Sequence, residues 1–528
     1  MISKLLLYVR TIRNMKPIQV FSRMKKMFGL GNSLGILPQP MPQDIRRFES
    51  VEELDYDKTF LSRFSADEFV DGWISFLHEK EKFNWKGEWL FREQSALWNF
   101  NLHYFEFLMP LTYSYKVTHD ARYLERIKAS ILGWIENNPC GIGTGWMSYT
   151  IAVRIVYWWS CFFTFSNVLE DRFKRRMLAS MYEQYVYLSG HLEKDLLANH
   201  YLEDLKALIL CAIAFQDERM LNKALTEFKK QCREQILPDG MHYELSPMYH
   251  KIILEAVLRV AVALKSVGKQ DREIEAYLPK MLDAANAFED GMERIPLFND
   301  GGNNVAKSLD ALLDATQNHY EMTPEKIASL PDSGYYFFRN GVWTLMVDAG
   351  RPGAKENPGH THCDAMSFEL FREGHPVLVN CGTYAYQCAD RAFFRSTRAH
   401  NTLSISGTEQ SECWGAFRMG RGSCVKVLDV NQCGIKMVMT DQRGNAAERI
   451  IQLEDGKLSI SDTSKGNQLQ VWLHVKDFEQ TKITASGRDT VCQREQQWYS
   501  EDYGLRMPVD TLTWTASDSI TITADLAD

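Results

Sequence analysis

The chain has 528 residues and a formal net charge of −8, with 45% hydrophobic and 24% charged residues. This length exceeds one ordinary core, so we expect at least two domains. The composition excludes a disordered chain. The acidic balance, without a stripe of basic and aromatic residues, argues against a nucleic-acid partner.

The chain begins with a basic arm, residues 1–45, which has no acidic residue before Asp44. Its longest apolar stretch, Leu5 to Val9, is shorter than the core of a signal peptide, which predicts a protein of the cytoplasm or the inner-membrane face. No stretch reaches the roughly 18 apolar residues of a membrane span.

The arm could also form an amphipathic helix, which predicts peripheral contact with a membrane. The alternative is a basic arm packed on the chain's own acidic body. The apolar positions that would share one helix face are Leu5, Leu6, Val9, Ile12, Ile18, Phe21 and Met24.

Residues 46–320 are expected to form a helical domain, because apolar residues recur at spacings of three and four from about Asp71 to Asp314. No motif of fixed period indicates a solenoid, so we expect paired helical hairpins. The predicted helices include Ala121 to Asn137, Ile151 to Val168, Asp195 to Phe215 and Lys251 to Gly268.

Residues 321–528 are expected to form a β domain, because the apolar period falls to about two and turn residues separate short runs. The eleven cysteines show no CxxC pair and no disulfide framework, so we expect free thiols in a reducing compartment. The predicted strands are Tyr335 to Phe338, Val342 to Asp348, Ser367 to Phe371, Pro376 to Asn380, Thr402 to Ser406, Glu448 to Leu453, Lys457 to Asp462, Gln470 to Val475 and Ser519 to Ala524.

Four polar clusters interrupt these apolar patterns, and the first opens a helix at Asn199-His200-Tyr201-Leu202-Glu203. Helical spacing places Asn199 and Glu203 on one face and lets His200 meet Glu203 or Asp204. A neighbouring carboxylate would raise the pKa of the imidazole. A capping or packing role is the alternative for this histidine.

The second cluster runs from Asp239 to His250 and combines a turn signal with two histidines, two tyrosines and Glu244. Tyr249 or His250 could shuttle a proton. The alternative is a helix entry in which Ser246 is the cap and Pro247 stands in the first turn.

The third cluster places His360, His362 and Asp364 at alternating positions, which in a strand would share one face and could handle a metal or an oxyanion. The fourth, from Arg391 to Thr402, holds three arginines and a histidine. It predicts a basic patch for an anionic ligand.

In this order the clusters resemble the heparinase II/III family, through the segments NHxxE, DGxxxExSPxYH, HxHxDxxSFEL and RSTxAHNT. The segment from Leu97 to Tyr104 is similar to the family's N-terminal signature. The resemblance implies an N-terminal (α/α) toroid followed by a C-terminal antiparallel β-sandwich. It also implies a polysaccharide lyase that cleaves a uronate-containing acidic polysaccharide by β-elimination. Such a reaction needs a base for the C5 proton, an acid for O4 and neutralisation of the C6 carboxylate.

Carried onto this sequence, the resemblance implies that Asn199 and His200 neutralise the carboxylate and that Glu203 assists them. Tyr249 would shuttle the proton, and His360 would be a second base or a carboxylate contact. Further candidates for contact with the substrate are Glu244, Arg395, Arg398, Trp98 and His103.

Some relatives hold zinc, and the positions that match their ligands are His362, Asn380 and His400. Asn380 stands where the pattern has Asp and brings no charge, so a zinc-bound and a metal-free site both stay open. The family also implies a periplasmic location as an alternative.

Two other functions stay open at this stage. A glycoside hydrolase on the same scaffold would use Glu203 and Glu244 as paired carboxylates. A non-catalytic glycan-binding or assembly protein would keep the cleft and lack turnover.

Overall fold

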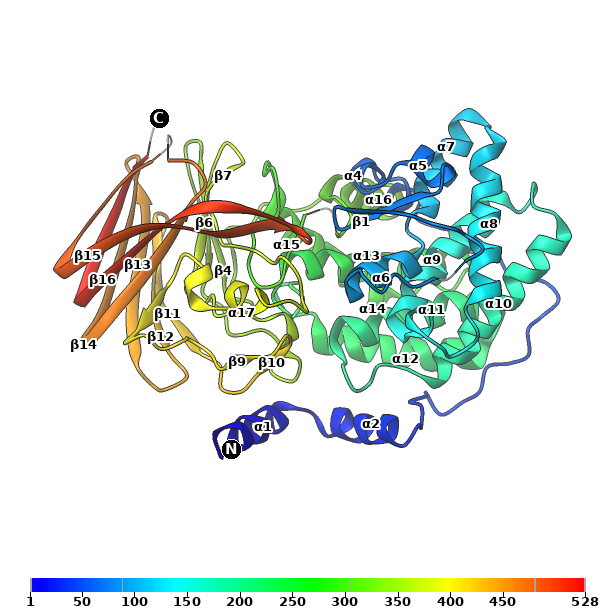
Figure 1. The fold of residues 1–528 in the computed structure, drawn as a ribbon, viewed down its shortest axis with the longest axis horizontal. Helices are drawn as coiled ribbons and strands as arrows, with labels where there is room; N and C mark the ends of the chain where they lie inside the picture. The colour runs from blue at the N-terminus through cyan, green and yellow to red at the C-terminus, as the bar shows by residue number, and fades with distance from the viewer. Residues whose placement is uncertain (1, 88, 304, 479–480, 527–528) are drawn as a thin grey trace.

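The computed structural model describes residues 2–87, 89–303, 305–478 and 481–526. Helices make up the N-terminal part of the chain and strands the C-terminal part, and the two lie side by side (Figure 1). This confirms the expected helical domain followed by an antiparallel sheet-rich domain.

The helical domain has an inner and an outer layer, which follow from how much of each helix is apolar. Inner helices α9 (Ser148–Phe165), α11 (Ala198–Ala214) and α13 (Pro247–Ser266) are buried on almost every side. Outer helices α8 (Ala121–Asn137), α10 (Asp171–Gly190) and α12 (Glu218–Gln235) bury one face each. A helix that is apolar all round must be covered on all sides, so the amphipathic helices enclose the apolar ones.

The predicted helices are present, and α8 has the predicted bounds. Helix α13 begins at Pro247, earlier than predicted, because Ser246 caps it by accepting the backbone N–H of Tyr249. The remaining elements of this domain are α3 (Glu52–Asp55), α4 (Lys58–Ser62), α5 (Ala66–Val70), β1 (Trp73–Phe76), β2 (Glu79–Lys82), α6 (Ala96–Tyr104), α7 (Leu108–Thr118), η1 (Thr144–Trp146), α14 (Arg272–Glu275), α15 (Leu278–Glu289) and α16 (Leu309–Tyr320).

The β domain is an antiparallel sheet folded over a shared apolar core. Leu345 and Leu370, from its first strands, belong to the same core as Met437, Ile451 and Ile522, from its last ones. The strands are β3 (Ser329–Leu330), β4 (Tyr335–Asn340), β5 (Trp343–Asp348), β6 (Phe368–Arg372), β7 (His375–Leu378), β8 (Leu403–Ile405), β9 (Cys413–Trp414), β10 (Arg418–Met419), β11 (Cys424–Val430), β12 (Gly434–Thr440), β13 (Ala446–Glu454), β14 (Lys457–Val475), β15 (Thr481–Asp502) and β16 (Leu505–Leu526), with short helices η2 (Pro358–His360), α17 (Arg391–Phe394) and η3 (Thr397–Ala399) between them.

Strands β15 and β16 form a long hairpin whose turn reaches the helical domain (Figure 1). At the turn, His78 Nε2 lies 3.2 Å from Asp502 Oδ2, and Gly504 packs against the backbone of Leu77. Strand β15 was not predicted, because much of it is polar and exposed and has no apolar alternation. The hairpin therefore connects the end of the chain to the domain interface.

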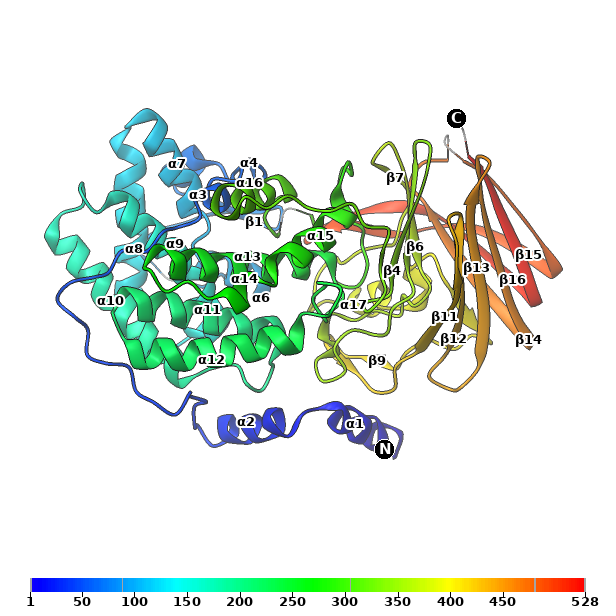
Figure 2. The same ribbon diagram turned by 180° about the vertical axis from the view of Figure 1, so that it is seen from behind.

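The basic arm forms helices α1 (Ile2–Asn14) and α2 (Pro17–Met27), which lie in line along the outside of both domains (Figures 1 and 2). Helix α1 contacts the β domain, where the Asn14 amide donates to the Gly420 carbonyl at 2.8 Å. On α2, the buried Gln19 amide donates to the Leu196 carbonyl at 3.2 Å and to the Glu356 carbonyl at 3.1 Å, one on each side of the interface. The arm thus packs on the chain's own body and bridges its two domains.

No helix in the described ranges is long and apolar enough to cross a bilayer. The eleven cysteines are free thiols.

A buried ion pair joins two strands of the sheet to the loops beside the cleft. Arg449 on β13 binds both carboxylate oxygens of Asp462 on β14, at 2.7 and 2.8 Å, and both side chains are fully buried. The guanidinium also donates to the carbonyls of Met366 and Asn401, at 3.0 Å each.

Replacing Arg449 with Met leaves the Asp462 carboxylate buried and unpaired, so we expect the free energy of unfolding to fall by about 3–5 kcal/mol. The matched control is Lys436→Met, which breaks a half-exposed pair with Glu448 and should cost at most about 1 kcal/mol. Urea unfolding followed by tryptophan fluorescence measures both losses. Equal losses would contradict this account of the pair.

Candidate active site

A cavity of about 660 Å³ lies where the two domains meet. Helices α6, α9, α11 and α13 supply one wall, and η2, the loop after β7 and the β15–β16 turn supply the other. The residues that carry its chemistry are Asn199, His200, Glu203, Tyr249, His360, Tyr386 and Tyr503. The first three polar clusters therefore meet in this cavity. Tyr386, from the loop after β7, and Tyr503, from the β15–β16 turn, join them there.

His200 lies in the first turn of α11 and binds Glu193, with 2.9 Å between Nδ1 and Oε2. The prediction that it meets Glu203 or Asp204 was wrong. Side chains of a helix's first turn lean back toward the preceding segment, which here carries Glu193, and Glu203 instead binds Lys206. Burial opposes protonation of His200, but Glu193 outweighs it and keeps the imidazole pKa above its usual value.

Asn199 and Glu244 are both buried, each with 1% of its surface exposed. Neither side chain has a hydrogen-bond partner among the described residues. Burial raises the pKa of Glu244 above its usual value. Buried polar groups without partners are costly, and Asn199 lines the cavity, so its amide is suited to contact a ligand.

Tyr249 stands in the first turn of α13, with its ring centre 3.9 Å from that of His360. Its hydroxyl lies 2.7 Å from that of Tyr386, which lies 2.7 Å from that of Tyr503. Burial holds the pKa of Tyr249 well above its usual value, so the free site contains a neutral phenol. Such a phenol can donate a proton and can regain one along the tyrosine chain.

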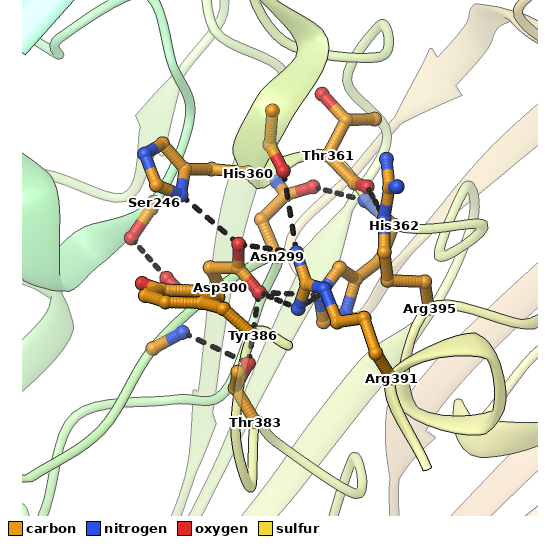
Figure 3. A network of polar contacts seen from close by, with 12 residues as sticks. Ser246, Asn299, Asp300, His360, Thr361, His362, Thr383, Tyr386, Arg391 and Arg395 are labelled. Carbon is orange, nitrogen blue, oxygen red and sulfur yellow. Dashed lines mark hydrogen bonds and ion pairs between the residues drawn. The ribbon is translucent and has the colours of Figure 1, made fainter. Parts of the chain in front are cut away.

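Asp300 is the centre of the polar network, and its carboxylate is fully buried (Figure 3). Oδ2 accepts from Nδ1 of His360 at 2.9 Å, and Oδ1 accepts from Nε2 of His362 at 2.8 Å. The Arg391 guanidinium contacts both oxygens, and Thr383 Oγ1 donates to Oδ1 at 3.1 Å. Burial would raise the pKa of Asp300, but Arg391 and the two histidines keep it well below its usual range.

The Asp300 contact fixes the tautomer of His360. A carboxylate only accepts hydrogen bonds, so His360 donates through Nδ1, and Nε2 is the ring nitrogen that can take up a proton; it lies 3.9 Å from Glu244 Oε1. Asp300 was missed in the sequence, where it reads as part of a glycine-rich boundary loop. Its position directly before two glycines was the available signal, since such turns let a side chain approach a site closely.

The strand predicted for His360, His362 and Asp364 is wrong. His360 ends the short helix η2, irregular backbone follows, and β6 begins at Phe368. The backbone N–H of His362 donates to the Asn299 side chain, so it forms no strand ladder. Asp364 accepts from the backbone of Asn299 at 2.8 Å, while the two histidines converge on Asp300.

The prediction that Arg395 and Arg398 contact an anionic ligand is also wrong. Arg395 is buried and donates to backbone carbonyls, among them those of Pro358 and Thr361, so it supports loops. Arg398 is exposed and lies over the Phe393 ring. Neither lines the cavity. The arginine that reaches the network is Arg391, whose helix α17 turns it inward.

Of the other predicted contacts with the substrate, Trp98 is part of the cavity wall, whereas His103 and Glu244 lie behind it. His103 is held between the Trp134 indole N–H and the Trp89 carbonyl, and burial lowers its pKa to about 3. Trp98 backs the cavity wall, fully buried, and donates to the Glu79 carbonyl. His103 and Glu244 are not among the lining residues.

The expected zinc position offers two imidazole nitrogens but no charged third ligand. His362 Nδ1 and His400 Nε2 face each other at 3.1 Å. The Asn380 carbonyl oxygen accepts the backbone N–H of Asn401 at 2.9 Å and brings no charge. No group of three histidine, cysteine or acidic side chains suited to a metal occurs among the described residues.

Comparisons with known proteins match this architecture. A family model described as Heparinase II/III N-terminus matches residues 3–327, and one described as Heparinase II/III-like, C-terminal matches residues 322–438. The chain is 23% identical over 411 residues to the heparin-sulfate lyase of Pedobacter heparinus, covering 69% of this chain and 59% of that protein. It is 24% identical over 383 residues to the heparin-sulfate lyase of Bacteroides thetaiotaomicron, covering 61% of this chain and 53% of that protein.

The fold is similar to solved structures of that kind. A crystal structure of heparinase III superposes with a TM-score of 0.68 at 18% identity, covering 91% of this chain and 85% of that chain. The heparan sulfate lyase HepC of Pedobacter heparinus gives a TM-score of 0.56 at 17% identity, covering 97% and 88%. The matches to the two curated relatives span between half and two thirds of those proteins.

Replacing Asp300 with Asn leaves Arg391 without its counter-charge, so we expect a loss of about 3–5 kcal/mol of stability at neutral pH. The folded pKa of Asp300 is depressed, so the carboxylate stabilises the fold above its unfolded pKa of about 4 and loses this effect as the pH falls. The loss caused by Asp300→Asn should therefore shrink on acidification, as measured by urea unfolding from neutral to acidic pH.

Asp364→Asn is the matched control, because burial raises the pKa of Asp364. The cost of that substitution should shrink as the pH rises, which is the opposite trend. The same pH trend for both variants would refute the assigned charge states.

Proposed function

The chain belongs to the heparinase II/III-like family, and from that premise we propose that it is a polysaccharide lyase that cleaves a uronate-containing acidic polysaccharide by β-elimination. One observation carries the proposal. The neutral phenol of Tyr249 contacts the tilted ring of His360, which donates through Nδ1 to Asp300, and His200 lines the same cavity.

Elimination at a uronate requires that the C6 carboxylate be neutralised while the C5 proton leaves. His200, whose imidazole pKa is raised by Glu193, and the unpartnered amide of Asn199 are the groups for this task. Their hydrogen bonds strengthen as negative charge builds on the carboxylate. They therefore stabilise the transition state more than the bound substrate.

In the proposed reaction, Nε2 of His360 takes the C5 proton, and the C–H electron pair forms the C4–C5 double bond. The C4–O4 bond breaks, and the leaving O4 takes the phenolic proton of Tyr249. The Tyr249 phenolate is then reprotonated through Tyr386 and Tyr503. No water is added, and no step needs a metal.

An acidic glycan also suits Lys307 farther along the cavity, where the other two cationic side chains, Arg63 and Lys206, are paired with Glu106 and Glu203. Lys307 is buried, which lowers its pKa to about 8, and its amine has no hydrogen-bond partner among the described residues. Two relatives are named heparin-sulfate lyase, so sulfated and unsulfated uronate glycans both belong in the test.

Incubation of the protein with a panel of uronate glycans should generate the ultraviolet absorbance of a C4–C5 unsaturated uronate. Tyr249→Phe removes the proton donor and should lower kcat by about 10²–10⁴-fold while glycan affinity stays within about twofold. The control Tyr113→Phe alters an exposed ring remote from the cavity and should keep full activity. New reducing ends without the absorbance would show a hydrolase, and glycan binding without turnover would show a binding protein.

We infer that zinc is not a resident cofactor, because the Asn380 oxygen is engaged by the backbone and lacks charge. Elemental analysis of the purified protein should give far less than one zinc per chain, and a chelator should leave the lyase rate unchanged. Asn380→Asp supplies the missing anionic ligand and should raise zinc content. Stoichiometric zinc in the wild type, removed together with activity by the chelator, would overturn this inference.

A further inference from the structure

Helices α1 and α2 place polar side chains against the protein and apolar side chains outward, which is the reverse of an ordinary surface helix. On α1, Thr11 and Asn14 face the protein and make hydrogen bonds to it, while Leu5 and Val9 are 65% and 54% exposed. A surface helix of a protein that meets only water normally buries its apolar side, so this arrangement needs an apolar medium outside the molecule.

Helix α2 repeats the pattern. Its inward positions Gln19 and Ser22 are polar and almost fully buried. Its outward positions include Phe21 and Met27 at 55% and 83% exposure, and Phe28, just beyond its end, is 76% exposed. The two helices lie in line on one side of the molecule in both views, and their inner faces contact the protein, so their apolar faces point away from it together (Figures 1 and 2).

The charge of this surface is opposite to that of the rest of the chain. The first 43 residues contain no acidic side chain, although the whole chain carries a net charge of −8. No ion pair joins Lys4, Arg13 or Lys25 to an acidic side chain among the described residues, and Lys25 lies over the Phe21 ring, 5.0 Å from its centre, whereas Lys26 binds Asp195 and Arg10 binds Glu412. The free cations flank the apolar faces, where anionic head groups would meet them.

A second basic feature adjoins α1. A recess of about 760 Å³ between α1 and the β domain has basic side chains on its rim, with Glu356 and Asp441 as its acidic members. The recess is large enough for a phosphorylated head group. Its basic lining residues are Arg10, Arg13, Arg351, Lys355 and Arg421.

We propose that α1 and α2 form a docking surface for an anionic lipid bilayer, on which the protein lies with both helices in the interface and the body outside. The apolar side chains would enter the boundary between head groups and acyl chains, and the basic residues would contact anionic lipid phosphates. This proposal does not depend on the lyase activity. Because Gln19 on α2 bridges the two sides of the cleft, the docked protein would hold its substrate cavity at a fixed height above the membrane.

The test is flotation of the full-length protein with vesicles of phosphatidylcholine alone or with phosphatidylglycerol added. We expect binding to the anionic vesicles and at least about tenfold weaker binding to the neutral ones. The double variant Val9→Glu/Phe21→Glu places charge on both exposed faces and should weaken binding to anionic vesicles at least about tenfold.

The matched control is Val117→Glu/Val491→Glu, since these side chains are 62% and 59% exposed on other surfaces. It should bind anionic vesicles as the wild type does, and all variants should keep the wild-type melting temperature. Absence of flotation with anionic vesicles would overturn the proposal. So would a wild-type dimer in light scattering that Val9→Glu/Phe21→Glu converts to monomers, because the apolar faces would then cover each other.

Discussion

The buried carboxylate of Asp300 is the interaction on which the rest of the cleft depends. It lies in the loop between α15 and α16, and it holds His360, His362 and Arg391 in one network. Its own backbone carbonyl accepts from Ser246, the cap of α13, at 2.6 Å. One residue thereby positions the imidazole on the β side and the start of the helix that carries Tyr249. A buried charge with this many partners tolerates little movement, which favours a preorganised site.

The regular elements could be predicted from the sequence because burial imposes a period on them. Helix α8 packs one face, so its apolar spacing alone defines its bounds. Strand β15 has a largely solvated surface and therefore no such signal. The two predicted runs from Lys457 and from Gln470 are parts of one strand, β14, since the polar segment between them stays paired to β16 at its ends.

The site was harder to predict than the fold, because its contacts join segments that are distant in sequence. Motif similarity named His200, Tyr249 and His360, which all line the cavity. It could not name Glu193 as the partner of His200, because that contact depends on how the loop before α11 folds back. Arg395 looked like a ligand-binding cation, yet loop carbonyls satisfy its guanidinium. The sequence shows which charged side chains are present, but the packing of the folded chain determines which of them lack a partner.

The long β15–β16 hairpin has a consequence for how this architecture can be divided. The matched family segments end at residue 438, yet Tyr503 at the hairpin's turn closes the tyrosine chain against the helical domain. The last ninety or so residues are therefore part of the cleft wall as well as of the sandwich. A chimera that exchanged this tail with that of a relative would also exchange a hydroxyl in the cavity. A change in this region can thus alter the hydroxyls that line the cavity while the motif residues stay the same.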